Sequence, residues 1–176
     1  MENNKTKTNY YLDINYKLKR LHKKIKVYVE HLKNIASLSE SSTLKVGALA
    51  VKKNFERDFN GYNGSVRNAK IYEETGTEEC SLEPGESGFI HAEMNLIAKF
   101  REYNPENYVV LLTHSPCSVC AKLLVNAGFK NVFWLEEYRE TDHLDDIFNG
   151  RLDYYGKIED LFKGDFALRV FYNLKI

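Results

Sequence analysis

Apolar residues recur at intervals of three and four between residues 14 and 38, with lysines between them. This spacing gathers the apolar side chains on one helix face, so it predicts a long amphipathic helix over 14–38. The apolar positions are Ile14, Leu18, Leu21, Ile25, Tyr28, Val29, Leu32, Ile35 and Ala36.

Two short runs with strand character follow this helix. The first covers residues 46–51 and the second ends near Tyr62, with a Lys-Lys-Asn turn between them. Glycine and asparagine residues end the second run. We therefore expect two neighbouring strands that form a hairpin at the start of a sheet.

The rest of the chain alternates between helical and strand patterns. Helices are predicted over 91–100, 117–126 and 141–148, and strands over 108–113, 132–135 and 166–174. This alternation is typical of parallel βαβ units with helices on both faces of a sheet. The expected fold is α/β, a three-layer α/β/α sandwich.

A polar segment over residues 65–90 interrupts this order. It shows no sustained periodicity, and six glutamates lie within 73–86. Long loops in compact domains are often lids or insertions. With no internal repeat, the sequence predicts a single domain over 1–176 that carries an acidic loop insertion at about 65–90.

The charges balance in number but not in position. Of 25 basic and 25 acidic side chains, 12 basic and 4 acidic ones lie in residues 1–53. This asymmetry fits either a basic surface for phosphates or nucleic acid, or two halves of one domain that attract each other. The lysines of the first helix are dispersed around an apolar stripe, which argues against a helix that binds nucleic acid.

The three cysteines point to metal or thiol chemistry. They cannot all pair, and 176 residues can bury a sizeable core without disulfides. No apolar run is long enough to cross a membrane, and the polar N-terminus lacks the apolar core of a secretory signal. We expect a cytoplasmic protein that does not contact membranes.

The strongest candidate chemistry lies at the starts of two consecutive predicted helices. His91 opens one of them, and Cys117 and Cys120 open the other. One imidazole and two thiolates suit zinc, and a tetrahedral ion would keep a fourth position for water. Glu93, two residues after His91, would lie beside the metal and move protons. This His-x-Glu and Pro-Cys-x-x-Cys pattern is a signature of zinc-dependent nucleobase deaminases.

Two other interpretations of these residues remain open. A single Cys-x-x-Cys can be a redox pair. In the second alternative Cys80, eleven residues before His91, completes a closed structural zinc site with four ligands. A structural site has no need of Glu93 beside the metal, so the catalytic interpretation is preferred.

Over roughly residues 15–140 the sequence resembles the cytidine/deoxycytidylate deaminase superfamily, and within it the deoxycytidylate (dCMP) deaminases. The matching segments are Lys45–Ala48, Gly61–Gly64 with Arg67, His91–Asn95, Ser115–Leu124 and Glu137–Arg139. The resemblance implies the cytidine deaminase type of sandwich, with a mixed five-stranded sheet.

The same resemblance implies a role for each matched residue. His91, Cys117 and Cys120 would bind zinc, Glu93 would be the proton shuttle and Asn63 would contact the deoxyribose. Lys45, Arg67 and Arg139 are candidates for phosphate binding, and Tyr138 is a candidate for packing against the base. The role of His114 stays open between lining the pocket and packing at a strand end.

The activity that the resemblance implies is hydrolytic deamination of dCMP to dUMP and ammonia, which would supply dUMP for thymidylate synthesis. Deamination of dCTP, alone or together with dCMP, is the nearest alternative. A tRNA adenosine deaminase and a non-catalytic nucleotide-binding relative are more distant ones. The resemblance also suggests a homo-oligomer, often a hexamer, with dCTP and dTTP as effectors. The acidic loop would repel an anionic ligand unless it folds away, or unless Mg²⁺ accompanies a triphosphate there.

Overall fold

The computed structural model describes residues 2–41, 44–65, 89–138 and 141–174, and the side chains of the first helix from residue 13 onward. The helices are α1 (Glu2–Ser37), α3 (Ala92–Lys99), α4 (Ser118–Asn126), α5 (Asp142–Phe148) and α6 (Phe166–Tyr172), with short 3₁₀ helices η1 (Pro105–Asn107) and η2 (Ile158–Phe162). The strands are β1 (Gly47–Lys52), β2 (Asp58–Tyr62), β3 (Gly64–Ser65), β4 (Phe89–Ile90), β5 (Tyr108–His114), β6 (Asn131–Glu136) and β7 (Tyr154–Lys157).

Five strands form one mixed sheet in the order β2–β1–β5–β6–β7. β1 is antiparallel to β2 and to β5, whereas β5, β6 and β7 are parallel to one another. The units β5–α4–β6 and β6–α5–β7 are therefore the predicted parallel crossovers. The predicted α/β fold with a mixed five-stranded sheet is confirmed.

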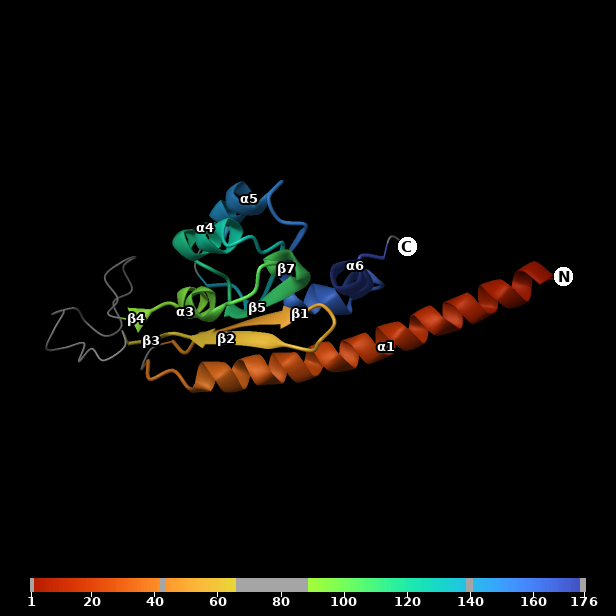
Figure 1. The fold of residues 1–176 in the computed structure, drawn as a ribbon, viewed down its shortest axis with the longest axis horizontal. Helices are drawn as coiled ribbons and strands as arrows, with labels where there is room; N and C mark the ends of the chain where they lie inside the picture. Colours follow the sequence, from red (N-terminus) through yellow and green to blue (C-terminus); the bar gives the residue numbers. More distant parts are fainter. Residues whose placement is uncertain (1, 42–43, 66–88, 139–140, 175–176) are drawn as a thin grey trace, which may run out of the picture.

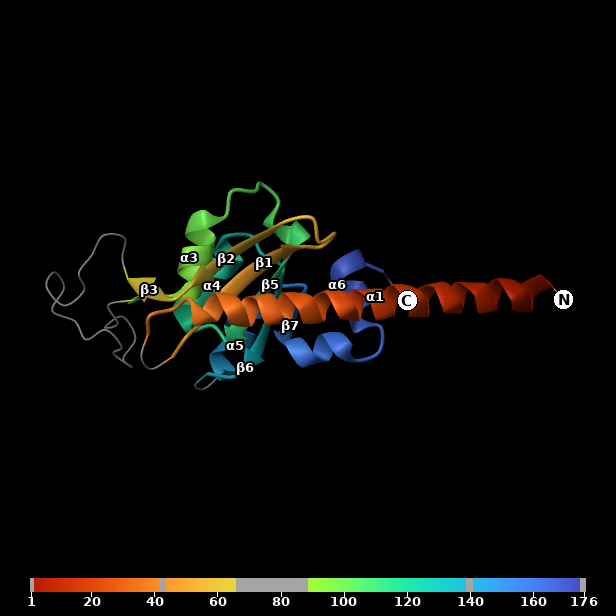
Figure 2. The same ribbon diagram turned by 90° about the horizontal axis from the view of Figure 1, so that it is seen from below.

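Helices cover both faces of this sheet, as Figures 1 and 2 show. On β1, Leu49 and Val51 pack on the side of α1 and α6, and the alternate residues Ala48 and Ala50 pack on the side of α3, α4 and α5. Side chains that alternate along a strand point to opposite faces, so each face of the sheet has its own apolar core. The three-layer prediction is confirmed.

The long first helix begins earlier than its apolar stripe. The predicted range 14–38 lies almost entirely within α1, which starts at Glu2. Leu21, Ile25 and Leu32 are fully buried against the sheet. The N-terminal part of α1 extends beyond the body of the molecule in both ribbon views (Figures 1 and 2).

The prediction of a last strand over 166–174 is wrong. Phe166–Tyr172 is helix α6, and Ala167, Val170 and Phe171 have the spacing of one buried helix face. The fifth strand is instead β7, a short segment at the sheet edge that contains Gly156 at φ 145°. Its brevity and its glycine gave no strand signal, while the apolar run in α6 did.

The starts and ends of several elements meet at one edge of the sheet. β1 begins there, β2, β5 and β6 end there, and α3 and α4 begin shortly after a strand end. In α/β sheets, this carboxyl edge of the parallel strands is where ligands bind.

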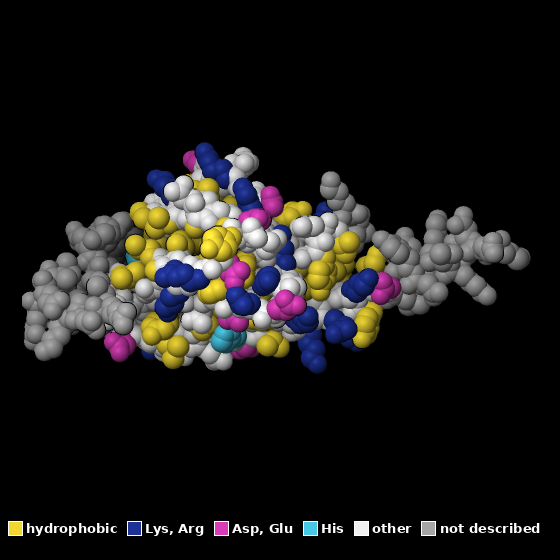
Figure 3. All heavy atoms as spheres, viewed as in Figure 1, with side chains coloured by type: hydrophobic (Ala, Val, Ile, Leu, Met, Phe, Trp, Pro, Cys, Tyr) yellow, Lys and Arg dark blue, Asp and Glu magenta, His cyan; other side chains and the backbone are white. Residues whose placement is uncertain are grey.

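The described surface shows no continuous basic patch on the face drawn in Figure 3, where lysine and arginine side chains alternate with acidic and apolar ones. Among the described helices, none is both long enough and apolar enough to cross a membrane.

Candidate active site

His91 and Cys117 occupy equivalent places at the starts of neighbouring helices. His91 is the N-cap residue of α3 and Cys117 is the N-cap residue of α4, and Cys120 lies in the first turn of α4. The His91 Nδ1 atom is 3.6 Å from Cys117 Sγ and 3.4 Å from Cys120 Sγ. Among the described residues, these three form the group whose ligand atoms converge closely enough for a metal ion, all within 4.8 Å of one another.

This donor set has the dimensions of a tetrahedral zinc site. Zn–N bonds of about 2.0 Å and Zn–S bonds of about 2.3 Å at a tetrahedral angle place nitrogen and sulfur about 3.5 Å apart. The two observed separations of 3.6 Å and 3.4 Å agree with that value. His91, Cys117 and Cys120 therefore fit zinc as three protein ligands.

The surroundings of the Cys117 thiol favour its ionised form. Its pKa is held well below the usual range, chiefly by the hydrogen bond from the Cys120 thiol and further by His91. The pKa of Cys120 is raised, because its proton is held in that same hydrogen bond and because the thiol is buried. A thiolate is the form in which cysteine binds a metal.

Glu93 lies in the first turn of α3 and is 4% exposed. Burial raises the pKa of its carboxyl group, against the lowering effects of its own backbone amide and of His91. Glu93 also interacts electrostatically with His91, Cys117 and Cys120, so the carboxyl group lies beside the candidate ligands. The structure thus brings together all four residues expected at the chemical centre: His91, Glu93, Cys117 and Cys120.

Gly61 allows α3 to lie directly on β2. A Cβ atom there would overlap the carbonyl oxygen of Ala92 and the amide nitrogen of Leu96, and it would lie 3.0 Å from the carbonyl carbon of Asn95. Only glycine permits so close an approach between the two backbones. The absent side chain at Gly61 therefore sets the position of the helix that carries Glu93.

The Asn63 side chain forms hydrogen bonds with the segment that precedes β1. Its Nδ2 donates to the Leu44 carbonyl at 2.8 Å, and its Oδ1 accepts from the Val46 amide at 2.7 Å. Lys45, which is exposed, lies between these two residues. A side-chain amide has two donor hydrogens and two acceptor sites, so Asn63 keeps one of each.

A second pairing brings Asn63 toward the metal ligands. Gly64 in β3 is opposite Ile90 in β4, and these two residues are the immediate neighbours of Asn63 and His91. Lys45, Asn63 and His91 consequently share the sheet edge described above.

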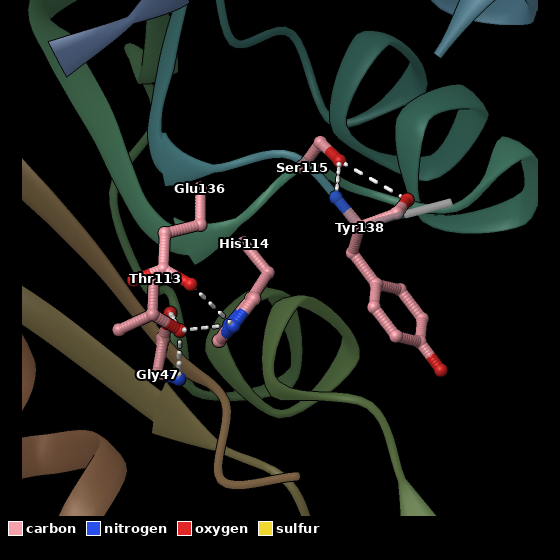
Figure 4. Close-up of polar contacts among 6 residues, drawn as sticks. All are labelled: Gly47, Thr113, His114, Ser115, Glu136 and Tyr138. Atoms are coloured by element: carbon pink, nitrogen blue, oxygen red, sulfur yellow. Dashed lines mark hydrogen bonds and ion pairs between the residues drawn. The ribbon is translucent and has the colours of Figure 1, made fainter. Parts of the chain in front are cut away.

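The close-up in Figure 4 shows how the ends of β5 and β6 are joined. The His114 Nδ1 is 3.1 Å from the Thr113 hydroxyl, and its Nε2 is 3.7 Å from a Glu136 carboxylate oxygen. Burial lowers the pKa of His114 and Glu136 partly opposes this effect. The ring of Tyr138 meets the His114 ring edge-on, with centroids 6.2 Å apart.

The sequence predicts no role for Ser115. In the structure it is 4% exposed and its side chain forms hydrogen bonds with the Tyr138 backbone. The sequence signal that could have indicated this contact is the position of Ser115, a hydroxyl residue directly after the buried strand β5. Among the other predicted contacts, Arg67, Arg139, Cys80 and nearly all of the acidic insertion lie outside the described residues.

Comparison with known families gives a match over the part of the chain that carries these residues. Residues 22–136 match the family model described as the cytidine and deoxycytidylate deaminase zinc-binding region. This chain belongs to the cytidine and deoxycytidylate deaminase family. The matched range of this deaminase includes His91, Glu93, Cys117 and Cys120.

Individual relatives of this deaminase are distant in sequence. It is 28% identical over 116 residues to ComE operon protein 2 of Bacillus subtilis (strain 168), a match that covers 65% of this chain and 60% of that protein. The chain thus spans about three fifths of that relative's length.

Solved structures of the dCMP deaminase from cyanophage S-TIM5 share its fold. The structure in complex with dCMP and dUMP matches at a TM-score of 0.60 and 29% identity, over 76% of this chain and 95% of that one. The apo structure matches at a TM-score of 0.59 and 26% identity, over 77% and 98%.

Proposed function

We propose that this deaminase hydrolyses dCMP to dUMP and ammonia, and so supplies dUMP for thymidylate synthesis. The observation that carries the proposal is the likeness to a phage dCMP deaminase solved with both dCMP and dUMP, over nearly the whole length of that protein. The buried Glu93 beside a zinc-compatible ligand set supports catalysis over a purely structural metal site.

The metal ligands of this proposal are His91, Cys117 and Cys120. When bound, zinc would supply an activated water and a positive charge near the reacting carbon. Cys117 at the N-cap of α4, Cys120 in its first turn and His91 at the N-cap of α3 would hold the ion.

Glu93 is the proton shuttle. Hydrolysis forms a bond between C4 and the water oxygen and breaks the bond between C4 and the amino nitrogen. One water hydrogen ends on N3 of the product and the other leaves with ammonia. A buried carboxyl group beside the reacting water can carry both, and general acid–base assistance of this kind contributes about 10²–10⁴-fold.

The nucleotide contacts of the proposal are the residues that the resemblance matches. Asn63 contacts the deoxyribose with its remaining donor and acceptor, and Tyr138 packs against the base. Lys45, Arg67 and Arg139 are the phosphate contacts of the proposal. The exposure of Lys45 next to the segment held by Asn63 supports its part.

Several further properties belong to the proposal as expectations from the sequence or from the resemblance. They are a homo-oligomer such as a hexamer, dCTP and dTTP as effectors, Mg²⁺ with a triphosphate, and a cytoplasmic location. Light scattering with and without each triphosphate would measure the first two.

The substrate is tested by ammonia release from zinc-loaded protein with dCMP, dCTP, deoxycytidine and an adenosine-containing RNA hairpin at equal concentration. We expect the largest kcat/KM with dCMP. A larger value with dCTP would move the assignment to the triphosphate, and activity confined to the RNA would overturn a nucleotide substrate altogether.

A further inference from the structure

Ser115 joins the ends of two parallel strands through three hydrogen bonds. Its backbone amide donates to the Glu136 carbonyl at 2.8 Å. Its hydroxyl accepts from the Tyr138 amide at 2.7 Å and donates to the Tyr138 carbonyl at 3.3 Å. Figure 4 shows the Ser115 side chain directed at the backbone of Tyr138. The side chain thus uses both its donor and an acceptor site on a single residue.

These bonds lie where the strand ladder stops. The last residue pair between β5 and β6 is His114 with Glu136, one position before Ser115. Beyond this pair, the Tyr138 backbone bonds to the Ser115 hydroxyl in place of a backbone group of β5. The chain after β6 can therefore leave the sheet and still be held at Tyr138.

The held segment includes the residue proposed to contact the base. The Tyr138 ring lies edge-on to the ring of His114, which immediately precedes Ser115. Cys117 is two residues after Ser115. In the four-residue segment from His114 to Cys117, Cys117 is a candidate metal ligand and His114, at the other end, contacts the Tyr138 ring. A shift of Tyr138 would change its proposed contact with the base and leave the candidate metal ligands at the starts of α3 and α4 in place.

We propose that Ser115 is a positioning residue whose hydroxyl fixes Tyr138 at the pocket and thereby sets nucleotide affinity. This inference rests on the proposed function, because it takes Tyr138 as the base contact. Ser115 itself does not touch the reacting atoms. Its removal raises KM and the dissociation constant for dUMP, and it leaves kcat and zinc content close to those of the wild type.

The central experiment compares Ser115→Ala, Ser115→Thr, Tyr138→Ala and the double variant S115A/Y138A. Loss of one to two net hydrogen bonds predicts about a tenfold rise in KM and in the dUMP dissociation constant for Ser115→Ala. The hydroxyl of threonine restores most of this loss. In the Tyr138→Ala background, Ser115→Ala has little further effect, because the ring on which it acts is gone.

Hydrogen exchange tests the structural half of the inference without any assay of activity. The Tyr138 amide is protected in the wild type and exchanges at least about tenfold faster in Ser115→Ala, because its acceptor is lost. Tyr28→Phe is the matched control. It removes another hydroxyl bonded to a backbone carbonyl, that of Phe55, on the opposite face of the sheet.

The possible failures are distinguishable. If the wild type releases no ammonia from any cytosine nucleotide and does not bind dUMP, the proposed function fails while the exchange result still tests the contact between Ser115 and Tyr138. An unprotected Tyr138 amide in the wild type would overturn the inference. So would a fall in kcat without a change in KM, or equal effects of Ser115→Ala with and without Tyr138. If Ser115→Ala does not fold, exchange in the wild type and a raised dUMP dissociation constant in Tyr138→Ala remain the deciding measurements.

Discussion

Gly61→Ala should separate helix α3 from strand β2 and disturb the site from a distance. The new methyl group would overlap the backbone of Ala92 and Leu96, and neither backbone atom can rotate away. Reaching ordinary contact near 3.5 Å requires α3 to move by about 1 Å. Such overpacking costs about 1–3 kcal/mol of unfolding free energy. Because His91 and Glu93 move with α3, we expect about a 100-fold loss in kcat/KM, the typical cost of a 1 Å misplacement.

Urea unfolding and initial rates of ammonia release measure these two effects on the same preparations. Gly64→Ala is the control for stability, because among the described residues a Cβ at Gly64 would meet only the Tyr62 ring, at 3.7 Å and 3.8 Å. We expect the control to unfold within about 0.5 kcal/mol of the wild type. A Gly61→Ala variant as stable and as active as the wild type would refute the reasoning that the α3–β2 contact positions Glu93.

Three further predictions concern other parts of the molecule. Leu111→Ala empties a position in β5 that is 1% exposed and should cost about 2–5 kcal/mol in urea unfolding; a loss below that range would mean that the core closes around the gap. Asn63→Ala removes two hydrogen bonds that hold residues 44–46, so we expect a loss of about 1–3 kcal/mol together with a raised KM for dCMP, and an unchanged KM would contradict its proposed substrate contact. Burial lowers the pKa of His22 below its ordinary value of 6.5, so protonation favours the unfolded chain and the contribution of His22 to stability is lost as pH falls below 6.5. The unfolding free energy of the wild type should then decrease more between pH 7.5 and 5 than that of His22→Gln, and parallel pH profiles would contradict this.

The sequence was sufficient to predict most of the fold because its patterns are local. The spacing in α1 and the apolar runs in β1, β5 and β6 each specify an element and the face it buries. Residues 166–174 and β7 show the limit of this approach. A short apolar run fits either a strand or a helix, and β7 is defined by its pairing with β6, which no local pattern records.

In the candidate site too, local spacing predicts some residues, whereas other contacts depend on residues far apart in the sequence. The convergence of His91, Cys117 and Cys120 was predictable because the two motifs each begin a helix, and Glu93 follows His91 by only two residues. The contact of Ser115 was not predictable, because its partner Tyr138 is 23 residues away in sequence and reaches the Ser115 hydroxyl only where the β5–β6 ladder ends. The backbone-holding role of Asn63 likewise depends on the return of the hairpin to residues 44–46.

The central claim is that Glu93 moves protons in a zinc-dependent deamination of dCMP, and Glu93→Gln tests it most directly. Glutamine preserves the size of the side chain but can neither accept nor release a proton at neutral pH. The measurement is ammonia release from dCMP by wild type and variant, with the zinc content of both determined on the same samples. We predict equal zinc content and a turnover reduced by about 10²–10⁴-fold. Wild-type turnover by the zinc-loaded variant would contradict the account.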